Sequence, residues 1–383
     1  MNRFSLRGFL LAILLAAFLV GHISLMIPRA SAVAPLCGSW KVVHSPPQTP
    51  IGDLYGVAID AHADGWVVGV SAPTLPTVYP LNLGIVEHWD GTRWHTVESP
   101  QPANYENDLY AVVALSPNDV WAVGSYQNAK NGYEQPQKTL IEHWDGTRWK
   151  VVASPNANAF FNSLTGLTAL APDDIWAVGS QGAVAGTSQT LVEHWDGTRW
   201  RIVPSPNGGS YDNVLEGVTA LSADDIWAVG ESTNGIGGDR TLVEQWNGQQ
   251  WNIVPSPSIG TFPNFLRKVS GVAPDDVWTV GGYWLYPGDI LNTLTEHWNG
   301  STWRVVASPN PPGGDNTLGA VAALASNDVW ATGYTAGVAL IQHWDGHQWR
   351  LVANSGDQGD LTSIAALNAH DIWAAGKQIM HDC

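Results

Sequence analysis

One six-residue block, D-V-W-A-V-G in its clearest copies, recurs along the chain and constrains the fold more than any other feature of the sequence. The tryptophans of its seven copies are Trp66, Trp121, Trp176, Trp227, Trp278, Trp330 and Trp373. Successive copies lie 43 to 55 residues apart. A repeat of this length indicates an architecture in which one small structural unit is used many times.

A second block, E-H-W-D-G-T-R-W in its clearest copies, follows each of the first six copies of the first block. A lone copy of its final tryptophan is present near the N-terminus, at Trp40. Within each repeat, short β-branched or aromatic segments alternate with turn residues, and the D-G pairs suit tight hairpin turns. Each repeat is therefore expected to form four antiparallel strands.

Four-stranded units of about 50 residues are typical of the blades of a β-propeller. Seven copies predict an all-β, seven-bladed propeller that forms a single domain over residues 33–383. Residues 361–377 match the first two strands of the last blade, and residues 38–45 match a fourth strand. We therefore expect the N- and C-termini to share the last blade and to close the ring, which removes exposed sheet edges.

Both cysteines of the chain lie near its ends, at Cys37 and Cys383. When the repeats are aligned, these two residues fall on either side of the same hairpin turn. Two cysteines in an exported protein favour a disulfide bond. The sequence thus predicts a disulfide between Cys37 and Cys383, with two free thiols as the alternative.

The first 32 residues have the pattern of a secretory signal peptide. Arg3 and Arg7 precede an apolar run at residues 9–21, and Ala30-Ser31-Ala32 forms a cleavage site of the A-x-A type. The apolar run is short for a membrane span. We expect a secreted or cell-surface protein with no membrane span after cleavage, and an uncleaved anchor is the alternative.

The W-A-V-G segment and the H-W-D-G-T-R-W block resemble the repeat of kelch and galactose-oxidase-like propellers. In that repeat an aromatic residue and a glycine pair precede a tyrosine and a tryptophan, and only Gly281-Gly282 keeps the full pair here. The D-G-T-R-W element also resembles the Asp-box of sialidase-like propellers, and the whole repeat resembles secreted DVWAVG proteins of bacteria. The copper site of galactose oxidase is not implied, because its thioether cysteine has no counterpart away from the termini.

Composition and repeat symmetry exclude several kinds of site. The formal net charge of −17 disfavours nucleic acid as a partner, because that affinity depends on Lys and Arg neutralising phosphates. Equivalent histidines lie in five different blades, and Gln245 replaces the histidine in another, so the blades keep them too far apart to bind one metal ion; they are His88, His143, His194, His297 and His343. Seven repeated aspartates, from Asp64 to Asp371, are expected to accept backbone N–H bonds in their turns. No metal and no cofactor is predicted.

Positions that break the repeat are the better candidates for function. The residue directly after the first-strand leucine varies among the blades. The predicted rim of the central funnel consists of Tyr55, Tyr110, Thr165, Glu216, Arg267 and Thr362, with Gly319 at the same position. A second candidate is the aromatic cluster Tyr283, Trp284 and Tyr286 in a variable loop. Such a cluster suits stacking on a sugar ring or gripping a peptide, and local packing of the loop is the alternative.

We therefore expect a monomeric, non-catalytic binding or scaffolding propeller that recognises a glycan or a protein through its loop-rich face. A carbohydrate-active enzyme of galactose-oxidase-like or lyase type is the alternative, with Glu216, Arg267 and the rim tyrosines as its catalytic groups. A structural component of the cell envelope is a third possibility. No nucleophile elbow, phosphate-binding loop or zinc-binding helix motif is present in the sequence.

Overall fold

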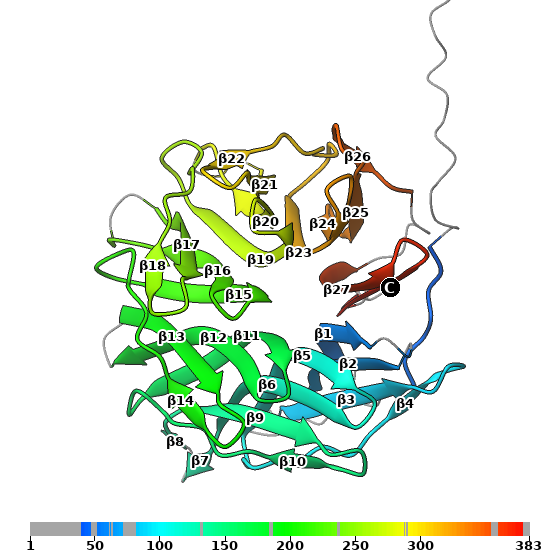
Figure 1. Ribbon diagram of the computed structural model, residues 1–383, viewed down its shortest axis with the longest axis vertical. Helices are drawn as coiled ribbons and strands as arrows, with labels where there is room; N and C mark the ends of the chain where they lie inside the picture. Colours follow the sequence, from blue (N-terminus) through cyan, green and yellow to red (C-terminus); the bar gives the residue numbers. More distant parts are fainter. Residues whose placement is uncertain are drawn as a thin grey trace, which may run out of the picture. The chain divides into compact units, whose positions relative to one another are not determined.

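The repeats form antiparallel sheets arranged around a central axis (Figure 1). The computed structural model describes residues 40–46, 52–60, 62, 64–71, 82–130, 133–183, 187–235, 238–286, 288, 290–353 and 359–377. The predicted signal peptide, Cys37 and Cys383 lie outside these residues. Within the described part of the chain, no helix has the length and hydrophobicity of a membrane span.

Six sheets have four strands each, ordered along the sequence from the axis outward. The first contains β1 (Gly52–Ile59), β2 (Gly65–Ser71), β3 (Leu83–Trp89) and β4 (Trp94–Thr96). The second contains β5 (Glu106–Ser116), β6 (Asp119–Gln127), β9 (Lys138–Trp144) and β10 (Trp149–Val151), and its loop carries a small hairpin of β7 (Ala129–Lys130) and β8 (Tyr133–Glu134). The third contains β11 (Phe161–Ala171), β12 (Asp174–Ala183), β13 (Thr187–Trp195) and β14 (Trp200–Ile202).

The next three sheets repeat this order. The fourth contains β15 (Asn213–Ser222), β16 (Asp225–Ser232), β17 (Arg240–Trp246) and β18 (Trp251–Ile253). The fifth contains β19 (Asn264–Ala273), β20 (Asp276–Tyr283), β21 (Asn292–Trp298) and β22 (Trp303–Val305). The sixth contains β23 (Asn316–Ala325), β24 (Asp328–Thr335), β25 (Val338–Trp344) and β26 (Trp349–Leu351).

The seventh sheet is shorter than predicted. Among the described residues it has two strands, β27 (Asp360–Asn368) and β28 (Asp371–Lys377), which lie between β23 and β1. Residues 40–46 form no strand, so the prediction of seven four-stranded blades is wrong in its last member. In the described part of the chain, six four-stranded blades and one two-stranded sheet form the ring.

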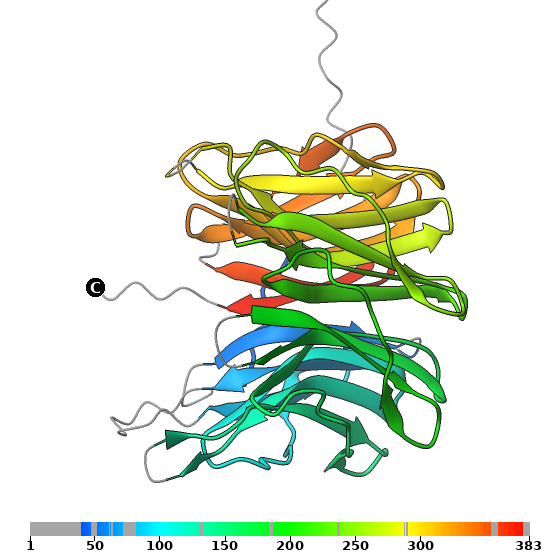
Figure 2. The same ribbon diagram turned by 90° about the vertical axis from the view of Figure 1, so that its left-hand side faces the viewer.

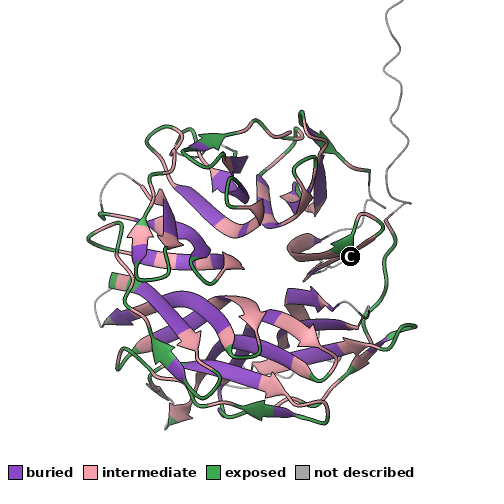
Figure 3. Ribbon diagram, viewed as in Figure 1, coloured by how far each residue is buried: buried purple, intermediate pink, exposed green. Residues whose placement is uncertain are grey.

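Tryptophans fill the wedges between neighbouring sheets. The ring of Trp66 lies 5.1 Å from that of Trp144 and 5.4 Å from that of Trp149, both in the next blade. The same arrangement closes the ring, because Trp373 of the seventh sheet lies 5.0 Å from Trp89 of the first blade. Buried residues lie mainly in the inner strands of the blades, and exposed residues lie mainly in the outer strands and loops (Figure 3).

The N-terminal segment contributes a tryptophan to this pattern. The ring of Trp40 lies 6.0 Å from that of Trp330 in an edge-on arrangement. In the fifth blade, Trp278 makes the equivalent edge-on contact with the last tryptophan of the sixth, Trp349, at 5.4 Å. Trp40 thus occupies the position expected of a fourth-strand tryptophan, although its backbone is not in a strand.

The repeated aspartates and histidines bind one another within five of the blades. Asp174, for example, accepts hydrogen bonds from the indole N–H of Trp176 at 2.9 Å and from the Nε2 of His194 at 2.8 Å. In the fourth blade the amide of Gln245 replaces the histidine and donates to Asp225 at 2.8 Å. The repeated aspartates therefore bind side chains, in place of the expected backbone N–H bonds. No group of three or more potential metal ligands occurs among the described residues.

Candidate functional site: a pocket on the propeller axis

A β-bulge places one residue of every first strand toward the axis. In each first strand, the pairing with the second strand slips directly after the repeat leucine. The extra residues are Tyr55, Tyr110, Thr165, Glu216, Arg267, Gly319 and Thr362. All seven divergent positions of the sequence are therefore bulge residues. A bulge re-aims the side chain that it carries, which accounts for their orientation toward the axis.

The glycine that ends the W-A-V-G block makes this bulge possible. In the second blade Gly124 pairs with Leu109, and a Cβ atom on Gly124 would overlap the carbonyl oxygen of Asp108. The equivalent glycines of the other blades are in the same situation: Gly69, Gly179, Gly230, Gly281, Gly333 and Gly376. The glycine is repeated because the bulged strand approaches its backbone closely.

Substitution of Gly124 by Ala tests this explanation. We expect a loss of about 1–3 kcal/mol in the free energy of unfolding, because the new methyl group must displace backbone. Gly84→Ala is the matched control, since a Cβ atom there would have no neighbour closer than 3.5 Å. Urea denaturation of both variants measures the effect, and equal stability of the two variants would contradict it.

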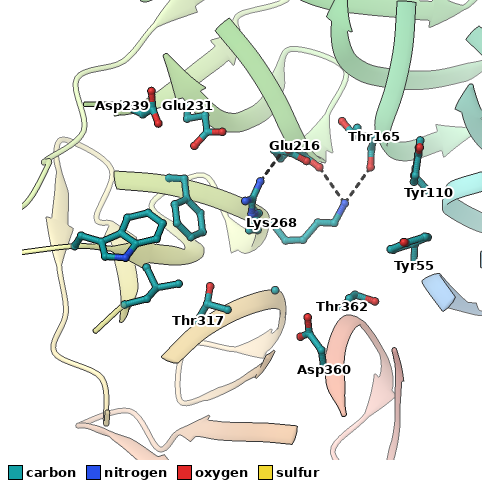
Figure 4. Close-up of a pocket in the computed structure, with 15 residues that line it drawn as sticks. Tyr55, Tyr110, Thr165, Glu216, Glu231, Asp239, Lys268, Thr317, Asp360 and Thr362 are labelled. Carbon is teal, nitrogen blue, oxygen red and sulfur yellow. Dashed lines mark hydrogen bonds and ion pairs between the residues drawn. The ribbon is translucent and has the colours of Figure 1, made fainter. Parts of the chain in front are cut away.

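The bulge residues surround one pocket of about 640 Å³ on the axis (Figure 4). All six residues predicted to form the funnel rim line it, together with Gly319. The other lining residues are Glu231, Asp239, Phe265, Lys268, Trp284, Leu291, Thr317 and Asp360. The structure thus brings the predicted rim residues together, and it adds charged groups that the sequence did not single out.

Variable loops border one end of this pocket. Asp239 lies in the loop between β16 and β17, and Trp284 and Leu291 lie in the loop between β20 and β21. The connections between blades lie beside such loops. For example, the backbone N–H of Tyr211, in the connection that precedes β15, donates to the carbonyl of Thr233, in the loop that follows β16, at 3.0 Å. The two variable sets of loops therefore lie at the same end of the propeller, which is visible side-on in Figure 2.

Lys268 crosses the axis within this pocket. At the position after the bulge the other blades carry small residues, namely Gly56, Ala111, Gly166, Gly217, Ala320 and Ser363. The Lys268 Nζ donates to the carbonyl oxygens of Thr165 at 3.1 Å and Glu216 at 2.9 Å. Burial lowers the pKa of this amine below its usual value. A single lysine therefore ties the fifth blade to the third and fourth across space that small residues leave open.

Glu216 and Arg267 form an ion pair rather than two independent charges. The Nη1 of Arg267 lies 2.9 Å from the Oε1 of Glu216, and the guanidinium lies 4.4 Å from the centre of the Phe265 ring. The side chains are 39% and 24% exposed, so the pair faces the pocket without being fully buried. Each charge is balanced by the other, which fixes both side chains in place.

Two tyrosines form the opposite wall. The rings of Tyr55 and Tyr110 lie 5.6 Å apart, and their hydroxyls donate to Asp53 at 3.4 Å and to Asp108 at 3.0 Å. Burial and the neighbouring carboxylates raise the pKa of Tyr55 to about 12 and raise that of Tyr110 further. Both hydroxyls therefore stay protonated at neutral pH, and neither tyrosine is suited to act as a base.

The aromatic loop residues do not form one surface. Trp284 lines the pocket and packs on Phe265 at 5.6 Å between ring centres. Tyr283 is half-buried and packs against the core between the fourth and fifth blades. Tyr286 is 67% exposed and does not line the pocket. Of the three predicted aromatic residues, only Trp284 shares a site with the rim residues.

Comparisons with known proteins agree with the fold. No protein-family model matches the chain, and no curated protein sequence is similar to it. A structure of YCF48 bound to D1 peptide is 13% identical, with a TM-score of 0.57 over 89% of this chain and 96% of that chain. YCF48 from Cyanidioschyzon merolae is 14% identical, with a TM-score of 0.55 over 89% and 97%.

A third solved structure, that of U3-55K, is 11% identical, with a TM-score of 0.52 over 85% of this chain and 86% of that chain. At these identities the likeness confirms the β-propeller fold alone. The resemblance to kelch and galactose-oxidase-like propellers stays a prediction.

Proposed function

We propose that this chain is an extracytoplasmic binding protein that recognises a glycan or a protein through the axial pocket. One observation carries the proposal: the seven first-strand positions that break the repeat converge on a single pocket, whereas the repeated Trp, His and Asp residues bind one another. A rigid scaffold that presents variable residues at one place is typical of recognition sites. Among the structures of similar fold, one is a complex with a peptide.

The shape of the pocket favours a compact group of a ligand over a broad protein surface. A volume of about 640 Å³ lies in the range of small-molecule sites, and the half-buried Trp284, which packs on the buried Phe265, supplies an aromatic surface to it. Aromatic rings of this kind stack on the apolar face of a sugar. A glycan that inserts one or two sugar units is therefore the ligand that we favour.

Removal of the Trp284 side chain tests the proposal. A glycan array and a peptide library identify a ligand for the wild-type protein, and Trp284→Ala is expected to weaken its binding about tenfold or more, as at other aromatic hot spots. Tyr286→Ala is the matched control, because Tyr286 lies nearby in sequence but outside the pocket. No ligand in either screen, or an effect of Tyr286→Ala alone, would contradict this function.

A carbohydrate-active enzyme is the second candidate, and Glu231 is the observation that favours it. Burial is the main cause that raises the pKa of this carboxyl to about 7, and a group that titrates near neutral pH can both donate and accept a proton. Glu216 and Arg267, the residues first expected to be catalytic, neutralise each other instead. Cleavage of a bound polysaccharide by the wild-type protein but not by Glu231→Gln would favour this candidate.

A further inference from the structure

The two cationic side chains of the pocket already have partners within the protein. Arg267 pairs with Glu216 and lies over the Phe265 ring. The Lys268 amine donates to two backbone carbonyls. Both cations are therefore engaged within the protein, and the four carboxyl groups that line the pocket outnumber them.

Three acidic side chains of the same pocket have no such partners. The carboxyl groups of Glu231, Asp239 and Asp360 accept no hydrogen bond and form no ion pair within the described residues. Glu231 and Asp239 lie near each other on the side of the fourth blade, and Asp360 lies across the pocket (Figure 4). Burial is the main cause that raises the pKa of Glu231; attraction from Arg267 opposes this shift, and repulsion from Asp239 and Glu216 adds to it. A bound cation would relieve this repulsion.

An aromatic ring is available in the same pocket. Trp284 lines it, whereas Phe265 is buried and already carries the guanidinium of Arg267 at 4.4 Å from its ring centre. Rings attract cations through their faces, most strongly for tryptophan. The pocket thus offers both hydrogen-bond acceptors and the indole of Trp284 to a positively charged group.

The charge of the whole chain acts in the same direction. A formal net charge of −17 attracts cationic ligands and repels anionic ones before contact. An acidic sugar in the pocket would meet three carboxyl groups while both cations are engaged. A neutral sugar would supply hydroxyl donors but would leave the repulsion between the carboxyl groups in place.

Resting on the proposed function, we propose that the pocket binds an amino sugar with a free ammonium group, held by Glu231 and Asp239 beside Trp284. The sugar ring stacks on the indole, and the ammonium group donates to the two carboxyl groups. Asp360, on the far side, accepts hydrogen bonds from hydroxyl groups of the same or the next sugar unit. The volume of about 640 Å³ accommodates a ligand of this size.

Calorimetric titration at pH 7 with three oligosaccharides of one length tests this inference. The probes are the hexamer of β-1,4-linked glucosamine, its fully N-acetylated form and cellohexaose. We expect the glucosamine hexamer to bind at least about tenfold more tightly than either neutral hexamer, and Glu231→Gln and Asp239→Asn each to remove most of that preference. Glu98→Gln, an exposed site outside the pocket, is the matched control and should change nothing.

The outcomes separate this inference from the proposed function. Equal binding of all three hexamers, weakened by Trp284→Ala, would overturn the amino sugar and leave the binding pocket intact. Binding of a lysine-rich peptide in place of any hexamer, with the same dependence on Glu231, would overturn the sugar as the source of the ammonium group. No binding of any probe, together with blank ligand screens, would overturn both proposals. Near-UV circular dichroism of each variant confirms that its fold is retained.

Discussion

The free energy of unfolding of this protein is expected to fall as the pH rises from 5 to 8, and Glu193→Gln is expected to remove part of that fall. Glu193 alone should account for on the order of 2–4 kcal/mol, since one pKa unit corresponds to about 1.4 kcal/mol. The opposite trend would follow if the acidic groups of the core were stabilised as ions. The prediction therefore specifies both the direction and the size of the change in the free energy of unfolding with pH.

Buried glutamates with raised pKa values cause this expected dependence, namely Glu142, Glu193, Glu244 and Glu296. They occupy the same third-strand position in the second to fifth blades, as Glu87 does in the first, and all five are at most 1% exposed. The sixth blade carries Gln342 there. Glu142 accepts a hydrogen bond from the Ser99 hydroxyl at 2.7 Å, whereas neither carboxyl oxygen of Glu193 has a partner among the described residues. Burial without compensation disfavours the charged form of such a group.

The sign follows from the direction of the pKa shifts. Burial raises the pKa of Glu142, Glu193 and Glu244 from about 4.5 to about 8. Between these values the folded chain holds protons that the unfolded chain has released. The contribution to stability is therefore complete below about pH 4.5, and it is lost as the pH rises through the folded value near 8.

Urea denaturation at pH 5 and pH 8 measures the effect. Glu193→Gln should be neutral or slightly destabilising at pH 5, because a buried amide replaces a protonated carboxyl, and stabilising at pH 8. The exposed Glu98→Gln is the control and should show the same small change at both values. A Glu193→Gln variant whose change in stability does not depend on pH would show that Glu193 is ionised in the folded protein.

The repeat predicted the fold well because each tryptophan fulfils the same packing role in every blade. The positions of Trp66, Trp144 and Trp149 in sequence are enough to define strands, blades and the wedges between blades. The seventh sheet was harder to predict. Residues 38–45 match a fourth strand by side chains, and Trp40 does reach Trp330, but residues 40–46 form no strand, so a tryptophan can hold its wedge position without strand pairing.

The rim residues were predictable for a different reason. Their residue type varies at one position of the repeat, whereas the positions around it keep the same residue types from blade to blade. The bulge that carries them was not recognised, although the glycine opposite, for example Gly124, is repeated in every blade. Glu231 and Asp360 were missed because only the closed ring brings them near the axis. The buried glutamates were missed because both faces of a blade are covered, so alternation along a strand does not indicate which side chains reach solvent.

Replacement of Trp227 by Ala should be among the most destabilising changes in the chain. Trp227 is fully buried, and its ring lies 5.0 Å from Trp298 and 5.4 Å from Trp303 of the next blade. Loss of such a side chain creates a cavity and is expected to cost about 3–5 kcal/mol in the free energy of unfolding. Urea denaturation at fixed pH measures this loss, and a loss below about 1 kcal/mol, as at an ordinary surface site, would show that the wedge collapses freely.

Replacement by phenylalanine at equivalent positions of two neighbouring wedges separates packing from hydrogen bonding. The indole N–H of Trp227 has no acceptor among the described residues, whereas that of Trp176 donates to Asp174 at 2.9 Å. Both rings lie 5.0 Å from the equivalent tryptophan of the following blade, so the loss of packing is matched. Trp176→Phe should therefore cost about 1 kcal/mol more than Trp227→Phe, because it also leaves Asp174 without one donor. Equal losses would mean that the repeated aspartate contributes through its histidine alone, and a larger loss for Trp227→Phe would contradict the assignment of these hydrogen bonds.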